Sequence, residues 1–492
     1  MSRTVQASCR LAALALLFLA GCAAGANFEK PGAPDVKGYT ESPLSTTSSS
    51  AIVAGGEAQR FVTAQDIPGE WWTLFRSKQL NALIERSLQA NPNLKAAQAA
   101  LAAARENVLA QKGAYYPSVA GSFFAGRQKT SSEISPTPNS GALYFGLYTP
   151  QVSVSYVPDV FGLNRRTVES LRAQEEQTRF ALVAVHIALS ANVVAAAIQE
   201  ASLREQIAAT RQVIAVNTDM LKILRNQFAE GYASRLDVAA QESQFAQVAA
   251  TLPPLLQQLA QQRDLLAVLS GGFPSQGTAE QFGLSTLQLP QELPLSLPSK
   301  LVAQRPDVRQ AEENLHSASA LVGIAAANRL PNITLSADAG AMALAARQVF
   351  DSGAGFWTLA GTVTQPILQG GALLHKERAA KAAYVQAAEQ YRSTVLTAFQ
   401  NVADTLNALE HDADALNAAA AAKDAASITL DLAKQQWQTG YTSYLALLSA
   451  EQAYHQAVIS LVQARANRYA DTAALFQALG GGWWNRDDLA RN

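Results

Sequence analysis

LPSKLVAQRPDVRQAEENLHSASALVGIAAANRLP, residues 297–331, is the stretch from which the fold can be predicted. It joins the end of a proline-containing linker to a helix-like run, and a proline stands where a strand pattern begins. A segment of the same design, ANPNLKAAQAALAAARENVLAQKGAYYP, occupies residues 90–117. Prolines in the two segments are separated by the same 214 positions, pairing Pro92 with Pro306 and Pro117 with Pro331. This spacing predicts a tandem duplication, so each half is interpreted against the other.

The composition excludes one broad class of partner. The chain has 492 residues, of which 49% are hydrophobic and 16% charged, and its formal net charge is −1. A nucleic-acid-binding domain needs a surplus of Lys and Arg on one face, which this balance does not supply. We therefore expect a protein of globular composition without a nucleic-acid partner.

The N-terminus has the design of an export signal. A basic start is followed by an apolar run, Leu11 to Leu19, and by small residues before Cys22. This ending resembles the lipobox of bacterial lipoproteins, so we expect cleavage before Cys22 and attachment of lipid, such as palmitate, to that residue. Ala23 rather than Asp follows it, which implies sorting to the outer membrane. The apolar run is too short to span a bilayer; the alternative is an ordinary secretory signal.

The rest of the chain divides by composition and by the duplication. We predict a signal peptide at 1–21, a lipid-anchored extended tether at 22–65, a first structural repeat at 66–270, a linker at 271–299, a second repeat at 300–482 and a C-terminal tail at 483–492.

Each repeat contains a long helical stretch. Residues 164–229 lack proline and glycine, and at ~1.5 Å per residue they would span about 95 Å. Such a length indicates a coiled-coil-like rod rather than the helix of a compact domain. Gly231 ends the rod and a second helix returns at 234–269, where a Pro-Pro pair should produce a kink. In the second repeat the break is at Gly440.

Each repeat also contains two strand candidates, expected at about 117–127 and 150–158 and again at about 331–341 and 356–365. Apolar and polar residues alternate in them, as in membrane β-barrels. Four strands are too few to close a barrel, since bacterial barrels have at least ~8, and an open sheet edge is not viable in lipid. Either the hairpins form a soluble sheet, or several chains share one barrel. The rods favour sharing.

The helices leave two further alternatives open. They contain alanine where amphipathic helices usually have leucine, which suits either the wall of a hollow tube or a solid alanine-rich coiled coil. The uncharged run Ala181–Ile198 is long enough for a membrane span. However, His186, Ser190 and Asn192 interrupt it, which argues against a transmembrane helix.

No enzymatic site is predicted. The five histidines lie in helical stretches without HExxH spacing, and the sequence has no GxSxG elbow, phosphate loop or Cys/His metal cluster. We therefore expect neither catalysis nor a cofactor, apart from the lipid on Cys22.

At this point the motifs resemble those of a known family, the outer membrane factors of tripartite efflux pumps: the TolC-like, more closely OprM-like and NodT-type, lipoproteins. The resemblance covers nearly all of residues 66–480. It rests on the order and spacing of Trp71-Trp72-x-x-Phe75, Asn91-Pro92, Pro158-Asp159-x-Phe161-Gly162, Leu297-Pro298-Ser299, Arg305-Pro306-Asp307-Val308-Arg309, Gly370-Gly371 and Gly440.

The resemblance implies a mainly α fold with a membrane β-barrel. A homotrimer would form a 12-stranded β-barrel in the outer-membrane lipid and a 12-helix α-barrel reaching into the periplasm. The helical turns at Gly231-Tyr232 and Gly440-Tyr441 would form the tip that meets a periplasmic adaptor, or membrane fusion protein. An inner-membrane transporter would supply the energy.

The resemblance also implies a gate at this tip, closed by inward-pointing acidic residues. Asp237 falls on one such position, but the positions after Gly440 have Ala446 and Ser449 instead of carboxylates. Closure would then depend more on packing by aromatic residues. The alternative for Asp237 is a solvated carboxylate near a helix start, worth a few tenths of a kcal/mol through the helix dipole.

The expected function is that of an outer-membrane exit duct for small molecules such as drugs, in a pump of the RND type. An outer-membrane duct for type I protein secretion is the first alternative. A structural coiled-coil envelope lipoprotein is an alternative of another class. Only three methionines are present, which disfavours export of copper or silver.

Overall fold

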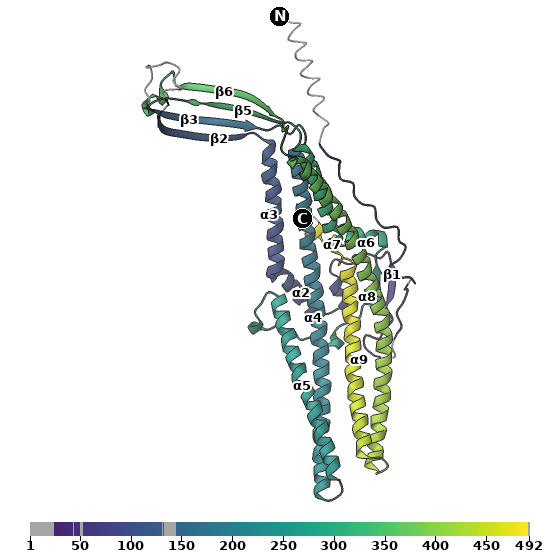
Figure 1. Cartoon of the computed structure of the whole chain (residues 1–492). Coiled ribbons are helices and arrows are strands. Elements are labelled where there is room, and N and C mark those ends of the chain that lie inside the picture. Colours follow the sequence, from purple (N-terminus) through teal and green to yellow (C-terminus); the bar gives the residue numbers. More distant parts are fainter. Residues whose placement is uncertain (1–23, 43, 50–52, 130, 132–143, 491–492) are drawn as a thin grey trace. The chain divides into compact units, whose positions relative to one another are not determined.

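The computed structural model describes residues 24–42, 44–49, 53–129, 131 and 144–490. These residues fall into two compact units (Figure 1). Unit 1 takes in residues up to 31, 101–177 and 311–391, and unit 2 takes in 32–100, 178–310 and the chain from 392 onward. The predicted signal peptide and Cys22 lie outside the described residues.

The principal elements follow one another in a duplicated order. They are β1 (Arg60–Thr63), α2 (Lys78–Ala90), α3 (Pro92–Lys112), β2 (Ser118–Lys129), β3 (Tyr144–Tyr156), α4 (Leu163–Ala229), α5 (Arg235–Leu269), β4 (Glu292–Leu295), α6 (Pro298–Gln304), α7 (Pro306–Ala327), β5 (Asn332–Ala341), β6 (Gly355–Thr364), α8 (Ala372–Gln438), α9 (Tyr444–Ala478) and α10 (Asp487–Ala490).

The duplication predicted from the sequence is confirmed by the lengths of the helices. α4 and α8 each have 67 residues, and α5 and α9 each have 35. At ~1.5 Å per residue, each longer helix measures about 100 Å. The pair Pro253-Pro254 lies inside α5, which remains a helix on both sides of it.

Unit 1 contains one antiparallel sheet with the strand order β2-β3-β5-β6. The two hairpins therefore lie side by side, joined through β3 and β5 (Figure 1). Within the described chain, β2 and β6 are the outer strands of this sheet. The four strands are found where the alternation of the sequence places them, but β3 begins at Tyr144, well before the expected start at about 150.

The register of the strands separates apolar from polar side chains, because directly opposed residues point to the same face. One face gathers Val119, Phe123, Val152, Val154, Ile333, Leu335, Trp357, Leu359 and Val363. The other gathers Ser118, Ser122, Gln151, Ser153, Ser155, Thr334, Ser336, Asp338, Thr358 and Thr362.

Unit 2 is held by an aromatic core near the start of the first repeat. The Trp71 ring stacks on Phe476 with centroids 5.3 Å apart and meets Trp72 edge-on. Trp71, Phe75 and the apolar face of α2 are fully buried. Such aromatic contacts add about 0.5–1.5 kcal/mol beyond area burial. These residues are those of the Trp71-Trp72-x-x-Phe75 motif, so the motif supplies buried aromatic side chains to unit 2.

The expectation of an extended tether up to residue 65 is wrong for its last part. β1 pairs in parallel with β4, inside the segment predicted as a linker. The fully buried Arg468 guanidinium donates to the carbonyls of Gly55 and Glu57, at 2.9 and 2.6 Å, and to Thr47 Oγ1 at 3.1 Å. The prediction assumed that a segment with few apolar residues would not dock on the folded protein. Hydrogen bonds from the buried Arg468 guanidinium dock it instead.

Among the described residues, α4 is the one helix with a stretch long and apolar enough to cross a membrane, with a mean hydropathy of 2.1. Of this stretch, 67% is buried inside the protein. Val183, Val193 and Val194 are nearly inaccessible to solvent. These contacts favour a core helix of unit 2.

Candidate functional site

The two helical turns at one end of unit 2 have the same backbone design (Figure 1). Gly231 and Gly440 are left-handed, with φ of +82° and +78°. After each glycine, a tyrosine N–H donates back five residues at 2.8 Å, from Tyr232 to Gln227 and from Tyr441 to Gln436. This is the Schellman motif, in which glycine is favoured because it has no Cβ. The tyrosine rings are 81% and 87% exposed.

The next helix begins with a serine cap in both turns, but the caps differ. Ser234 Oγ accepts from the backbone N–H of Asp237 at 3.1 Å, and Asp237 Oδ2 accepts from the Ser234 N–H at 3.1 Å. This reciprocal capping box satisfies two donors. In the second turn, Ser443 Oγ accepts from Ala446 at 3.3 Å, and alanine returns no bond. The predicted gate carboxylate therefore has a structural partner on its own helix.

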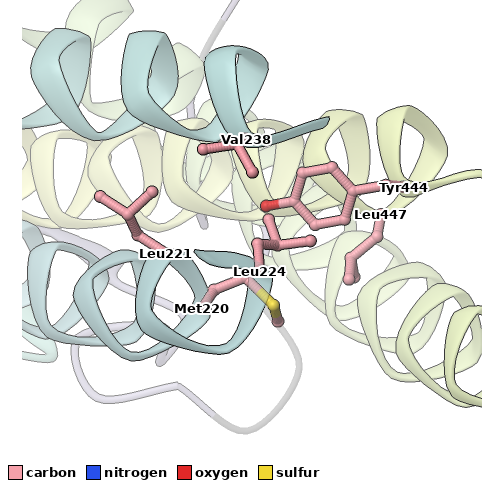
Figure 2. Close-up of a cluster of buried hydrophobic side chains, with 6 residues drawn as sticks. All are labelled: Met220, Leu221, Leu224, Val238, Tyr444 and Leu447. Carbon is pink, nitrogen blue, oxygen red and sulfur yellow. The ribbon is translucent and has the colours of Figure 1, made fainter. Parts of the chain in front are cut away.

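A buried apolar cluster joins the two turns (Figure 2). It consists of Met220, Leu221, Leu224, Val238, Tyr444 and Leu447, from α4, α5 and α9. Trp437 of α8 packs edge-on against Tyr444, with ring centroids 5.7 Å apart. The structure therefore brings together the two turns predicted as a tip, on one shared core.

A chain of buried hydrogen bonds runs beside this cluster. The Tyr444 hydroxyl donates to Gln241 Oε1, and Gln241 Nε2 donates to Asn217 O and Oδ1 at 2.9 and 3.0 Å. Gln241 and Asn217 are completely buried. Buried polar groups with all partners in place specify one packing, since any shift leaves a group unsatisfied at about 1–3 kcal/mol.

Sequence reasoning expected aromatic residues to pack at the tip, but it missed Gln241 and Asn217. The usable signal was weak: two amides on helix faces that are otherwise apolar. The tertiary packing decides which faces of α4, α5 and α9 contact one another. The periodicity of apolar residues along one helix does not reveal these contacts.

The sheet of unit 1 contributes the second part of the candidate site. Within the described strands, Asp338 is the one acidic or basic residue on the polar face, and its carboxyl group accepts from Ser153 Oγ at 2.5 Å. The arrangement offers a hydrophilic surface backed by an apolar one. Among the described residues, no group of three or more His, Cys, Asp or Glu side chains could hold a metal ion.

Comparison with known proteins agrees with this architecture. A family profile described as "Outer membrane efflux protein" matches residues 83–272 and 297–481. The toluene efflux pump outer membrane protein TtgF of Pseudomonas putida is 28% identical over 489 residues, covering 95% of each chain. The pyoverdine export outer membrane protein OpmQ of Pseudomonas aeruginosa is 29% identical over 465 residues, covering 92% of this chain and 94% of that one.

Solved structures show the same fold. The outer-membrane channel OprN superposes with a TM-score of 0.84 at 25% identity, covering 94% of this chain and 100% of that one. VceC of Vibrio cholerae superposes with a TM-score of 0.79 at 26% identity, covering 85% of this chain and 100% of that one. The duplicated fold predicted from the sequence is thereby confirmed.

Proposed function

The chain belongs to the outer membrane efflux protein family, and we propose that it is the exit duct through which a tripartite pump carries small molecules from the periplasm to the exterior. The observation that supports this most strongly is the sheet: four antiparallel strands with one apolar face, one polar face and two outer strands. In lipid the outer edges need partners, because unpaired backbone groups there cost several kcal/mol each.

Three copies would satisfy those edges. Four strands from each of three chains make a barrel of twelve strands, which exceeds the minimum of ~8 known for bacterial barrels. The apolar face would then contact lipid, and the polar face would line the pore. Helices α4, α5, α8 and α9 of the three copies would continue the pore as a tunnel into the periplasm.

The tip supports partners at the periplasmic end. Tyr232 and Tyr441 project from turns fixed by glycine, and tyrosine supplies large contact area at low entropy cost. We assign these turns to contact with a periplasmic adaptor, which would couple the duct to an inner-membrane transporter of the RND type. Asp237 would face its two copies at the constriction and contribute to gating.

The lipid anchor has structural support two residues from the proposed attachment site. The Ala24 N–H donates to Phe161 O at 2.9 Å, and buried Arg166 donates to the carbonyls of Ala24 and Gly25 at 3.1 and 3.0 Å. These contacts fix Ala24 and Gly25 close to where β3 ends and α4 begins. Lipid on Cys22 would therefore be attached two residues before a point at which the chain is held to the protein.

A labelling experiment tests the anchor. Cys22→Ala should abolish incorporation of labelled palmitate while trimers still form. Unchanged labelling would exclude Cys22 as the attachment site.

Conductance separates the duct from the alternatives. Purified protein in a planar bilayer should give ion channels, whereas a coiled-coil envelope lipoprotein would give none. Type I protein secretion is the second candidate within the channel class. Relatives named for export of toluene and of pyoverdine favour small molecules as cargo. Deletion of the gene should raise sensitivity to such compounds without loss of a secreted protein.

A further inference from the structure

The duplication places two glutamates at equivalent positions in very different surroundings. Glu242 of α5 and Glu451 of α9 are 209 positions apart, the same offset as the turn glycines Gly231 and Gly440. Glu242 is partly exposed, with its Oε1 2.9 Å from Arg225 Nη2. Its environment is that of an ordinary surface ion pair, worth roughly 0–1 kcal/mol.

Glu451, by contrast, is buried and has no such ion pair within the described part of the chain. Its exposure is 8%, and its buried Oε2 atom has no hydrogen-bond partner. Lys434 of α8 stands at the position equivalent to Arg225, but it is exposed and makes no ion pair with Glu451 among the described residues. An unpaired buried carboxylate is far more stable neutral than ionised.

A small cavity of about 100 Å³ lies beside Glu451, between α4, α8 and α9. Apolar side chains form much of its wall, including Val213, Val216 and Leu430. His455, one helical turn beyond Glu451, also lines it, and its Nε2 is 3.5 Å from Thr210 Oγ1 of α4. Surroundings of this kind accommodate a neutral group but provide little solvation for a charged one.

The same cavity touches the hydrogen-bond chain of the tip. Asn217 lines the cavity, and both its backbone and side-chain oxygens accept from Gln241, which in turn accepts from Tyr444. Tyr444 lies two turns before Glu451 on the same helix. A change at Glu451 therefore has a direct structural route to the packing of the two turns.

We propose that Glu451 is a protonation-dependent latch of the tip: neutral Glu451 permits the close packing of α9 against α4, and its ionisation loosens that packing. The proposal rests on the assignment of this end of unit 2 as the gated end of an export duct. The species that the site exchanges with the periplasm is a proton, so opening would depend on pH.

The other groups around the site set the sign of the effect. The titratable neighbours of Glu451 are Lys434 of α8 and His455, Tyr444 and Tyr454 of α9. The charge of Asp237 of α5 contributes to the electrostatic environment of Tyr444. The residues of α4 that line the cavity have no titratable side chain. Burial raises the pKa of Glu451, and the charge of Lys434 opposes this in part. Burial lowers the pKa of His455.

The sign follows from linkage. A carboxyl whose pKa is raised in the packed state stabilises that state below its ordinary pKa, and the stabilisation disappears as pH rises through the raised value. Opening should therefore increase with pH. Each unit of pKa difference between packed and loosened states changes the equilibrium by about tenfold. His455 acts in the opposite direction, because its protonation on acidification would place a charge in the cavity.

The test compares the two repeat-equivalent glutamates. Channel opening of the full-length protein in planar bilayers is recorded from about pH 5 to pH 8, above the ordinary Glu pKa of about 4.3. Wild type should open several-fold more often at the higher pH. Glu451→Gln, which keeps the shape but cannot ionise, should remain at the low level throughout. Glu242→Gln, the matched control, should keep the wild-type profile.

Hydrogen exchange of the α9 amides near the tip provides a readout that does not require conductance. Exchange should accelerate with pH beyond its intrinsic base catalysis in wild type and in Glu242→Gln, but not in Glu451→Gln. A wild-type pH profile in Glu451→Gln by either readout overturns the latch. His455→Gln should keep the rise, because the histidine acts in the opposite direction, and loss of the rise in this variant would also contradict the latch.

The failure of the latch is distinguishable from failure of the duct. If none of the proteins conducts, the proposed channel function is wrong, and the exchange experiment still decides whether Glu451 controls the packing of α9. If all of them conduct with identical pH profiles, the duct stands and the latch does not.

Discussion

Among single residues, Asp237 has an observed role as part of the cap of α5 and a proposed role at the gate, and substitutions can separate the two. Its carboxylate accepts from both the N–H and the Oγ of Ser234, at 3.1 and 2.6 Å, so it caps α5 whatever else it does. Three such carboxylates brought together in a trimer would repel one another.

We predict that Asp237→Asn and Asp237→Ala both raise single-channel conductance and lower cation selectivity, since both remove the charge. Only the alanine should also remove the hydrogen bond that the N3 side chain accepts from the Ser234 N–H in the capping box, at a cost of about 0.5–1.5 kcal/mol. Planar-bilayer recordings combined with thermal unfolding measure the two effects. Wild-type conductance in the asparagine variant would show that Asp237 caps α5 and has no part in gating.

Arg468 is the residue on which the docked N-terminal segment depends. Its guanidinium is fully buried and donates to Gly55, Glu57 and Thr47. We predict that Arg468→Met releases this segment, because each buried acceptor left unsatisfied costs about 1–3 kcal/mol. Limited proteolysis with mass mapping should show new cleavage between residues 44 and 63.

The matched control is Arg60 in the same segment. It forms an exposed ion pair with Glu292 at 2.5 Å, and exposed pairs are worth roughly 0–1 kcal/mol. Arg60→Met should leave the cleavage pattern unchanged. Equal resistance to protease in wild type and Arg468→Met would show that the segment is held by other contacts.

At the scale of elements, the turn at Gly440 joins α8 to α9 through one left-handed residue. A Cβ at this position would meet no atom within 4 Å, so the cost of a substitution is in the backbone alone. We predict that Gly440→Ala destabilises the turn by about 1–2 kcal/mol. Gly440→Asn should cost less, since asparagine tolerates this conformation. Hydrogen exchange of the amides after the turn measures both, and equal exchange in the two variants would contradict the assignment.

The elements also show what sequence reasoning can and cannot reach. The rods, the turn glycines and the strands follow from periodicities of 3.6 and 2 residues and from the rarity of glycine in helices, all of which are local. The docking of Thr47, Gly55 and Glu57 was missed because it depends on Arg468, more than 400 positions away. Glu451 and Gln241 were missed as buried polar groups for the same reason: burial is decided by the helices that meet.

For the complete assembly, a barrel shared by three copies requires the two outer strands of the sheet to pair between copies. Neighbouring strands of the sheet are all antiparallel, so β2 and β6 run in opposite directions. The edge of β6 in one copy can therefore pair with the edge of β2 in the next copy as another antiparallel pair. The chain has two cysteines, Cys9 in the predicted signal peptide and Cys22 at the proposed lipid site. Disulfides formed by introduced cysteines can therefore be detected with little background from the native cysteines.

Disulfide crosslinking between the outer strands of membrane-inserted protein is the most direct measurement. Thr358→Cys on β6 is combined in turn with cysteine at Ser118, Ala120 or Ser122 of β2, all on the polar face. We predict that at least one pairing gives a covalently closed trimer and nothing larger. Products confined to single chains, or a ladder that continues past three, would contradict a barrel shared by three copies.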